Sequence, residues 1–198
     1  MGFYIFFLML GYIWRKKKPE IKGTIGEKIV ARQLKKVILE DYKIINNLLI
    51  KTEKGSVQID HLIISPYGFL VIETKNYKGW IYGSEEDDYW LQVINKRSKF
   101  KFRNPIKQNW SHIYALKEVL PEYQEVPFYS IIVLTGEAIL KTQHNVRTEV
   151  IYPSMLYETI LNHRGITKLK LQDIEKIYNN LKCLNLDKKK DREEHIKQ

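Results

Sequence analysis

The chain has 198 residues, a formal net charge of +10 and 44% hydrophobic residues, and its isoelectric point is near 9.4. This length allows one compact domain with extensions, and the positive charge favours an anionic partner such as nucleic acid or a membrane surface. The single cysteine, Cys183, excludes an internal disulfide, and the sequence has no Cys/His zinc spacing, no glycine-rich phosphate loop and no Gly-x-Ser-x-Gly nucleophile motif.

The first segment, residues 2–14, is almost continuously apolar, and the basic run Arg15–Lys18 follows at once. The apolar run is shorter than the roughly 20 residues of a typical spanning helix, and it lacks the leading positive charge and small cleavage-site residues of a signal peptide. The positive-inside rule places the basic run, and the chain after it, in the cytoplasm. We therefore predict a short N-terminal hydrophobic helix that anchors the protein to the membrane. The alternatives are an apolar segment packed on the domain and the remnant of a longer helix.

The next segment begins with Thr24 and Glu27, which have the spacing of a capping box, and apolar residues then recur at helical spacing up to Val37. Tyr42–Ile50 follows and is typical of a first strand. The sequence therefore predicts a helix and then a strand before the central part of the chain.

The centre of the sequence is a predicted hairpin. Two short apolar runs rich in β-branched residues, Leu62–Ile64 and Phe69–Ile72, are separated by a Pro-Tyr-Gly turn. Both runs are apolar on both faces, which is typical of strands in the middle of a covered sheet. A two-residue turn pairs Ser65 with Gly68, whereas a bulge at Gly68 shifts the pairing by one residue.

Ionisable side chains lie at the outer ends of these runs, where charges are costly unless they are paired or bind a metal. With the two-residue turn, Asp60 lies opposite Glu73 and Gln58 lies opposite Lys75. With the bulge, Asp60 meets Thr74 instead. Two opposed carboxylates, with Cβ atoms roughly 4.5–5.5 Å apart, repel each other unless a proton or a cation lies between them. A divalent cation with oxygen ligands would fit.

After the hairpin, residues 85–88 form an acidic turn that we expect to be solvated, and Tyr89–Val93 is typical of a strand. The segment 95–105 interleaves basic and aromatic residues without an acid. This pattern is typical of nucleic-acid contact, because basic residues neutralise phosphates and aromatic residues stack on bases, or of an edge strand protected by lysines. The candidate nucleic-acid-binding residues are Lys96, Arg97, Lys99, Lys101 and Arg103.

Pro105 fits the first turn of a helix that runs to about Leu120. Within it, Gln108 could face the hairpin ends and position a water molecule or an amine, and His112 is expected to be packed or at the surface. The elements expected beyond it are strands at Pro127–Thr135 and Glu149–Tyr152, a helix to about His163 and a helix to about Leu184.

Four of these elements, taken in order, resemble the nuclease-related domain (NERD) family of the PD-(D/E)xK nuclease superfamily, over about Gly23 to Gly136. The matching residues are Gly23-Thr24-Ile25-Gly26-Glu27, Ile59-Asp60-His61, Ile72-Glu73-Thr74-Lys75-Asn76 and Asn104-Pro105-Ile106-Lys107-Gln108-Asn109. One departure is that Ile59 stands where the superfamily motif has proline.

The resemblance implies an α/β fold with a restriction-endonuclease-like core, in which a mixed sheet of about five strands is flanked by helices. It also implies a Mg²⁺ or Mn²⁺ cofactor. The expected metal ligands are Asp60, Glu73, Glu27 and Thr74, the last through its carbonyl. The expected catalytic residues are Asp60, Glu73, Lys75, Gln58 and Gln108. Lys75 would orient the attacking water or stabilise charge developing on the phosphate.

The predicted organisation is an anchor with a basic flank at 1–18, a nuclease-like core at 22–136, a C-terminal strand and helices at 137–184, and a charged tail at 185–198. The predicted function is that of a membrane-anchored, Mg²⁺-dependent DNA endonuclease with the bulk of the chain cytoplasmic. The alternative is a non-catalytic nucleic-acid-binding or scaffold protein tethered to the membrane, since the basic segment and net charge fit both.

Overall fold

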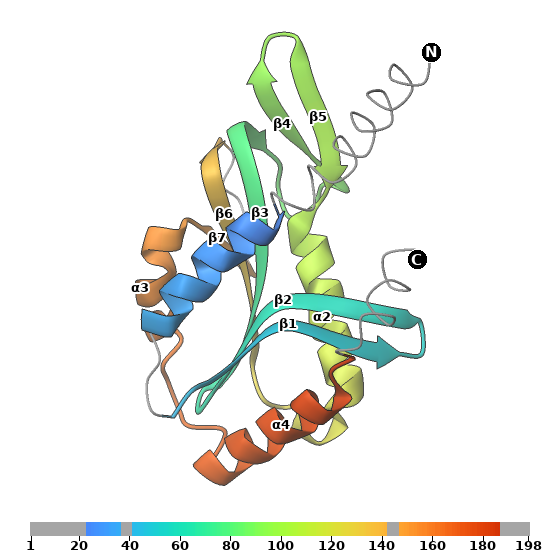
Figure 1. Ribbon diagram of the computed structural model, residues 1–198, viewed down its shortest axis with the longest axis vertical. Coiled ribbons are helices and arrows are strands. Elements are labelled where there is room, and N and C mark those ends of the chain that lie inside the picture. The colour runs from blue at the N-terminus through green and yellow to red at the C-terminus, as the bar shows by residue number, and fades with distance from the viewer. Residues whose placement is uncertain (1–22, 37–40, 142–146, 187–198) are drawn as a thin grey trace, which may run out of the picture.

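The computed structural model describes residues 23–36, 41–141 and 147–186 (Figure 1). Residues 23–36 form a helix. The strands are β1 (Lys43–Thr52), β2 (Gly55–Ser65), β3 (Gly68–Tyr82), β4 (Tyr89–Asn95), β5 (Ser98–Arg103), β6 (Phe128–Leu140) and β7 (Thr148–Ile151). The other helices are α2 (Pro105–Val119), the short 3₁₀ helices η1 (Pro121–Tyr123) and η2 (Pro153–Met155), α3 (Leu156–Asn162) and α4 (Leu171–Leu184).

The strands form one mixed, seven-stranded sheet in the order β1-β2-β3-β4-β5, with β6 paired to β3 and β7 paired to β6. β6 runs parallel to β3 and β7, and α2 lies in the long connection that this parallel pairing requires. The predicted α/β fold with a mixed, helix-flanked sheet is confirmed. The expected number of about five strands is wrong, because the β4–β5 hairpin and the short β7 extend the sheet.

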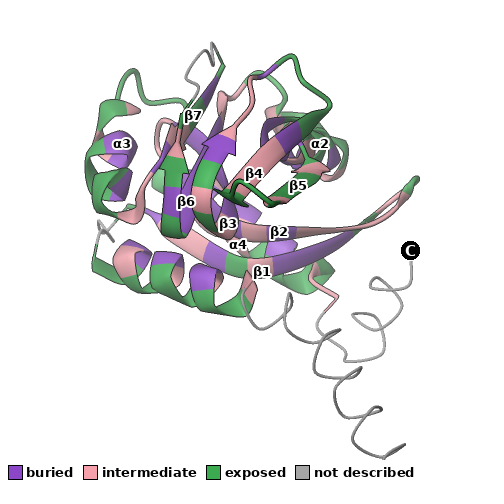
Figure 2. Ribbon diagram, turned by 90° about the horizontal axis from the view of Figure 1, so that it is seen from above, coloured by how far each residue is buried: buried purple, intermediate pink, exposed green. Residues whose placement is uncertain are grey.

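Helices cover both faces of the central strands (Figures 1 and 2). On one face, alternate residues of β2 and β3 such as Leu62 and Val71 pack against α2 and α4. On the other face, their neighbours Ile63 and Ile72 pack against the helix 23–36 and α3. Side chains alternate along a strand, so coverage of both faces explains why these runs are apolar throughout.

The predicted two-residue turn between β2 and β3 is present, with Ser65 paired to Gly68. The pairing between these strands ends at His61 and Ile72. Beyond that point β2 continues against β1, and β3 continues against β6 as far as Ile81. On the edge of β3 opposite β6, which β2 has left, the next paired residue is Trp80, where β4 begins to pair with β3. Residues 73–79 of β3 therefore have no strand partner on this edge among the described residues.

The start of α2 is fixed by one buried side chain, Asn104. Its Oδ1 accepts a hydrogen bond from Ile106 N and caps the helix, while its Nδ2 donates to the carbonyl oxygens of Ser84, Glu85 and Asp87. The acidic turn is therefore held against α2. Glu85 itself is buried, so the expectation of a wholly solvated turn is wrong at that residue.

Among residues 23–36, 41–141 and 147–186, no helix is long and apolar enough to cross a membrane. The anchor predicted at 1–18 lies outside the described residues, as does the charged tail from residue 187 onward. The segment 185–186, by contrast, is tied to β1, since Asn185 Oδ1 accepts from Leu49 N and Leu186 N donates to Leu49 O.

Candidate functional site

The unpaired edge of β3 is where the predicted acidic residues lie. Asp60 lines a hollow together with Gln108 and His112 of α2. Lys75 contacts Gln108 and Glu73 contacts His112, so all three charged groups lie on the side that α2 covers. Asp60 Oδ2 accepts a 2.8 Å hydrogen bond from Thr74 N, just past the last backbone pair. The Asp60 carboxylate thus accepts the hydrogen bond that a backbone carbonyl of β2 would accept from Thr74 N if the two strands were still paired.

Lys75 joins β3 to α2. Its ammonium donates to Glu73 Oε1 at 2.6 Å and to Gln108 Oε1 at 2.9 Å. The Glu73 side chain is only 4% exposed and that of Lys75 18%. Burial by itself would lower the pKa of Lys75, but the Glu73 carboxylate, with smaller contributions from Tyr77 and Asp60, raises the pKa above its usual value. Lys75 therefore remains a cation at neutral pH.

The carboxyl groups of the site lie close enough to repel one another. The pKa of Asp60 is raised well above its usual value, chiefly by burial and then by the Glu73 carboxylate, and the Thr74 hydrogen bond offsets only part of this. The pKa of Glu27 is also raised, first by burial and then by Glu73. Opposed acids of this kind are stabilised by a shared proton or a cation.

Gly26 allows Glu27 to approach. A Cβ atom at Gly26 would lie 2.7 Å from Thr135 Oγ1 and 3.0 Å from Asn76 Cβ, which is too close for any larger residue without movement of the neighbours. The helix 23–36 can therefore pack directly on β3 and β6, and this contact places the neighbouring Glu27 near the unpaired edge of β3.

His112 also belongs to this site. It is buried on α2 one turn after Gln108, and its Nδ1 lies 3.4 Å from Glu73 Oε2. The expectation of a packed or surface histidine did not include this contact. The signal in the sequence was the spacing of four residues between Gln108 and His112, which places both side chains on one face of a helix.

A hollow of about 600 Å³ opens beside these groups. Its lining residues come from β2, the end of β5 and α2, and they are Ser56, Val57, Gln58, Asp60, Arg103, Gln108, Ser111 and His112. Gln58 donates to Asn47 Oδ1 at 3.3 Å and does not pair with Lys75, since β2 has already separated from β3 at this point. The predicted pairing of Gln58 with Lys75 is therefore wrong, although Gln58 does line the hollow.

The oxygen donors suit a hard divalent cation. Glu73 Oε2 is buried and accepts no hydrogen bond from the described residues. The N–H and C=O of one strand residue point the same way, so the Thr74 carbonyl faces Asp60 across the gap. Two carboxylates and a carbonyl match Mg²⁺, which often has one or two carboxylate ligands with water and substrate phosphate. The described residues contain no group of three or more His, Cys, Asp or Glu side chains arranged to hold a metal ion.

The five basic candidates do not form one cluster. Arg103 lines the hollow beside Asp60. Lys99 and Lys101 lie on β5, which among the described strands pairs with β4 alone and is therefore an edge strand, as one of the two interpretations of this segment predicted. Lys96 and Arg97 lie in the turn before it. Arg103 is thus the basic candidate nearest to the acidic groups.

The chain thus combines a mixed α/β fold with an acid–lysine cluster on an unpaired strand edge. The sequence profile of the NERD family, the nuclease-related domain, matches residues 22–135. An uncharacterized protein of Bacillus anthracis is 35% identical over 191 residues, which cover 95% of this chain and 88% of that protein. The chain belongs to the NERD family. A crystal structure of a protein of unknown function, AF1548, matches 84% of this chain and 91% of its own at 12% identity, with a TM-score of 0.37.

Proposed function

We propose that this protein is a divalent-metal-dependent DNA endonuclease with a restriction-endonuclease-like core. The observation that supports this best is the group formed by Asp60, Glu73, Lys75 and Gln108 at the unpaired edge of β3. Binding of a phosphate alone gains nothing from clustered carboxylates, which repel an anion. A cation between the carboxylates reverses that effect, so the acids and the substrate phosphate become compatible.

Asp60, Glu73 and the Thr74 carbonyl are the ligands that we propose for Mg²⁺ or Mn²⁺, with Glu27 as a further acid. When bound, the ion polarises the scissile phosphate and lowers the pKa of a coordinated water. Lys75 has a different task. Its ammonium, held by Gln108 as well as by Glu73, stabilises negative charge that develops on the phosphate oxygens or orients the attacking water.

Three other residues support this arrangement. Arg103 lines the hollow and can neutralise a phosphate that enters it. His112 contacts the second oxygen of Glu73 and restricts the position of that carboxylate. Gln58 lines the hollow beside Asp60 and is a candidate to hydrogen-bond the substrate or a water molecule.

The test is cleavage of supercoiled plasmid DNA by the full-length chain with Mg²⁺ or Mn²⁺. We expect Asp60→Asn, Glu73→Gln and Lys75→Met each to reduce the rate at least about 100-fold, the scale seen when a charged group that stabilises a transition state is removed. Asp88→Asn, which changes an exposed acid of the nearby turn, is the matched control and should retain full activity. Equal cleavage by Asp60→Asn and the unaltered chain would exclude the assignment.

The alternative function is non-catalytic binding of nucleic acid, and it is supported by the basic residues of β5. It predicts salt-sensitive DNA binding that does not depend on a divalent ion, with no cleavage under any metal condition. Calorimetric titration with Mn²⁺ separates the two functions, because only the nuclease predicts binding of the metal that is lost in Glu73→Ala.

Attachment of residues 1–18 to a membrane, with the rest of the chain on the cytoplasmic side, is the second part of the proposal. It rests on the apolar run and the basic residues that follow it. Flotation with lipid vesicles tests it: the full-length chain should float with the vesicles, and a chain that lacks residues 1–18 should remain in the dense fraction. Equal behaviour of the two chains would contradict the anchor.

A further inference from the structure

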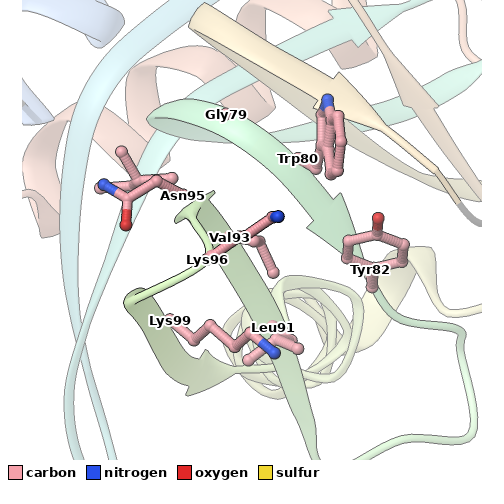
Figure 3. A pocket seen from close by; sticks show the side chains of 9 residues that line it. Gly79, Trp80, Tyr82, Leu91, Val93, Asn95, Lys96 and Lys99 are labelled. Atoms are coloured by element: carbon pink, nitrogen blue, oxygen red, sulfur yellow. The ribbon is translucent and has the colours of Figure 1, made fainter.

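A groove separate from the site hollow runs along the β4–β5 hairpin (Figure 3). Its volume is about 810 Å³, within the roughly 300–1,000 Å³ that is typical of ligand sites. Aromatic, aliphatic and basic side chains line it together, among them Trp80, Tyr82, Leu91, Val93, Lys96 and Lys99. None of the described residues that line this groove is acidic.

The strand register connects this groove to the site hollow. Val93 pairs with both Trp80 and Lys99, which places these three side chains on one face of the hairpin. Alternation along β5 then places Lys99, Lys101 and Arg103 on that same face. Arg103 lines the hollow beside Asp60. A row of three cations, about 13 Å long at 3.3 Å per residue, thus leads from the groove to the acids.

Trp80 is the aromatic residue most open to a ligand in this groove. The residue is 48% exposed, an unusual degree of exposure for tryptophan. The ammonium of Lys141 lies 5.2 Å from the centre of the indole ring. Lys141 directly follows β6, which pairs with β3 at Trp80, whereas Lys99 is reached through β4. A second lysine therefore lies over the indole ring, from the β6 side of β3. Both a flat apolar surface and positive charge are available at the same point.

We propose that this groove binds single-stranded nucleic acid, with an unpaired base stacked on Trp80 and the sugar–phosphate backbone along Lys99, Lys101 and Arg103. The path toward the acids rests on the proposed nuclease function, whereas binding in the groove does not. The substrate class that follows is DNA with an unpaired segment beside the cleavage position.

The composition of the groove favours a single strand over a duplex or a lipid surface. A base inside a duplex is already stacked between its neighbours and cannot stack on an indole, whereas a base of a single strand can. Duplex binding without base contacts uses phosphates alone. A membrane surface is broad and is met by residues that project from a protein, whereas Trp80 and Val93 line a concave groove between strands. The row of cations along one strand matches the regular phosphates of a nucleic-acid backbone.

The experiment is fluorescence anisotropy with a labelled oligothymidylate of about 15 nucleotides, within the usual site sizes of single-strand binders. The full-length chain is used without divalent ions, so that no cleavage occurs. Trp80→Ala should weaken single-strand binding roughly tenfold because it removes the surface on which a base stacks, and Trp80→Phe should retain most of the binding because it keeps an aromatic ring. A blunt duplex should bind both variants as it binds the unaltered chain.

The cation row has its own readout. Each phosphate contact on a single strand contributes about 0.7 to the slope of log K against log salt, so a Lys99→Gln/Lys101→Gln double variant should lower that slope by about 1.4. Tyr157→Ala removes an exposed aromatic side chain of α3 and serves as the control with unchanged binding. Circular dichroism melting verifies that each variant is folded.

Unchanged single-strand affinity in folded Trp80→Ala, or an equal loss of duplex affinity, would overturn the proposal. So would a Trp80→Ala variant that loses binding to anionic phosphatidylserine vesicles while it retains binding to the oligonucleotide. Asp60→Asn separates the two proposals, since it should abolish cleavage and leave groove binding intact. If the unaltered chain binds the single strand through Trp80 but cleaves no DNA, the nuclease function fails and the groove stands.

Discussion

Replacement of Lys75 by methionine tests the chemistry of the site through stability alone. The substitution retains the length and the apolar stem of the side chain but removes the ammonium that contacts Glu73 at 2.6 Å. Glu73 is then a carboxylate with 4% exposure that has lost its ammonium partner and retains the contact with His112. Removal of one partner of a buried ion pair typically costs about 3–5 kcal/mol, so we expect a loss of about 4 kcal/mol at pH 7. For a domain of this size that corresponds to a fall in Tm of roughly 10 °C.

The loss should depend on pH in one direction. A buried carboxyl group without a partner is costly only in its charged form, so the deficit should be smaller at pH 4 than at pH 7. In the unaltered chain, the folded state raises the pKa of Lys75. The charged Lys75 therefore stabilises the fold fully below the usual lysine pKa of about 10.4, and this contribution is lost as the pH rises through the raised pKa.

The assay is urea unfolding followed by circular dichroism at pH 7 and pH 4. Lys107→Met is the matched control, because Lys107 contacts Asp88 at 2.7 Å with side chains 43% and 82% exposed, and such a surface pair contributes less than about 1 kcal/mol. The Glu73→Gln/Lys75→Met double variant should recover most of the loss. The reasoning is refuted if Lys75→Met is as stable as the unaltered chain at pH 7, or if its deficit is the same at both pH values.

Three further outcomes follow from the structure. Burial lowers the pKa of His61 from 6.5 to about 4, so the unfolded chain binds the proton at a higher pH than the folded chain does. The free energy of unfolding should therefore fall by about 3 kcal/mol between pH 6.5 and pH 4. In urea unfolding, His61→Gln should reduce that dependence of the midpoint on pH. Asn104→Ala removes a helix cap and three hydrogen bonds to carbonyls; thermal scans should show a loss of about 3 kcal/mol, against little change for the exposed Asn179→Ala. Glu27→Gln should weaken Mn²⁺ binding in calorimetry about tenfold without lowering stability at pH 7, since the raised pKa of Glu27 shows that the fold disfavours its ionised form. Unchanged Mn²⁺ affinity would remove Glu27 from the metal ligands.

The hairpin and its register could be predicted because they depend on local patterns. Alternation decides which residues face each side of a sheet, and the Pro66-Tyr67 turn sets the pairing of Ser65 with Gly68. The contact between Lys75 and Gln108 was also anticipated, since a proline-started helix placed Gln108 near the strand ends. These inferences needed only neighbours in sequence and one helix position.

Features that depend on distant partners could not be predicted in the same way. The separation of β2 from β3 after His61 arises because β1 continues to pair with β2 while β6 continues to pair with β3. That competition removed the expected pairing of Gln58 with Lys75. Likewise, the ion pair between Glu85 and Arg147 joins residues far apart in sequence, and no local pattern indicated that this acid of the turn would be buried.

The contacts of Asn104 have a mechanical consequence. Asn104 is the one residue between the end of β5 at Arg103 and the start of α2 at Pro105. Its side-chain amide also donates hydrogen bonds to the loop that leads into β4. These contacts couple the β4–β5 hairpin and the first turn of α2 into one rigid unit. A force applied to the hairpin tip would be transmitted to Gln108, and from there to the amine of Lys75.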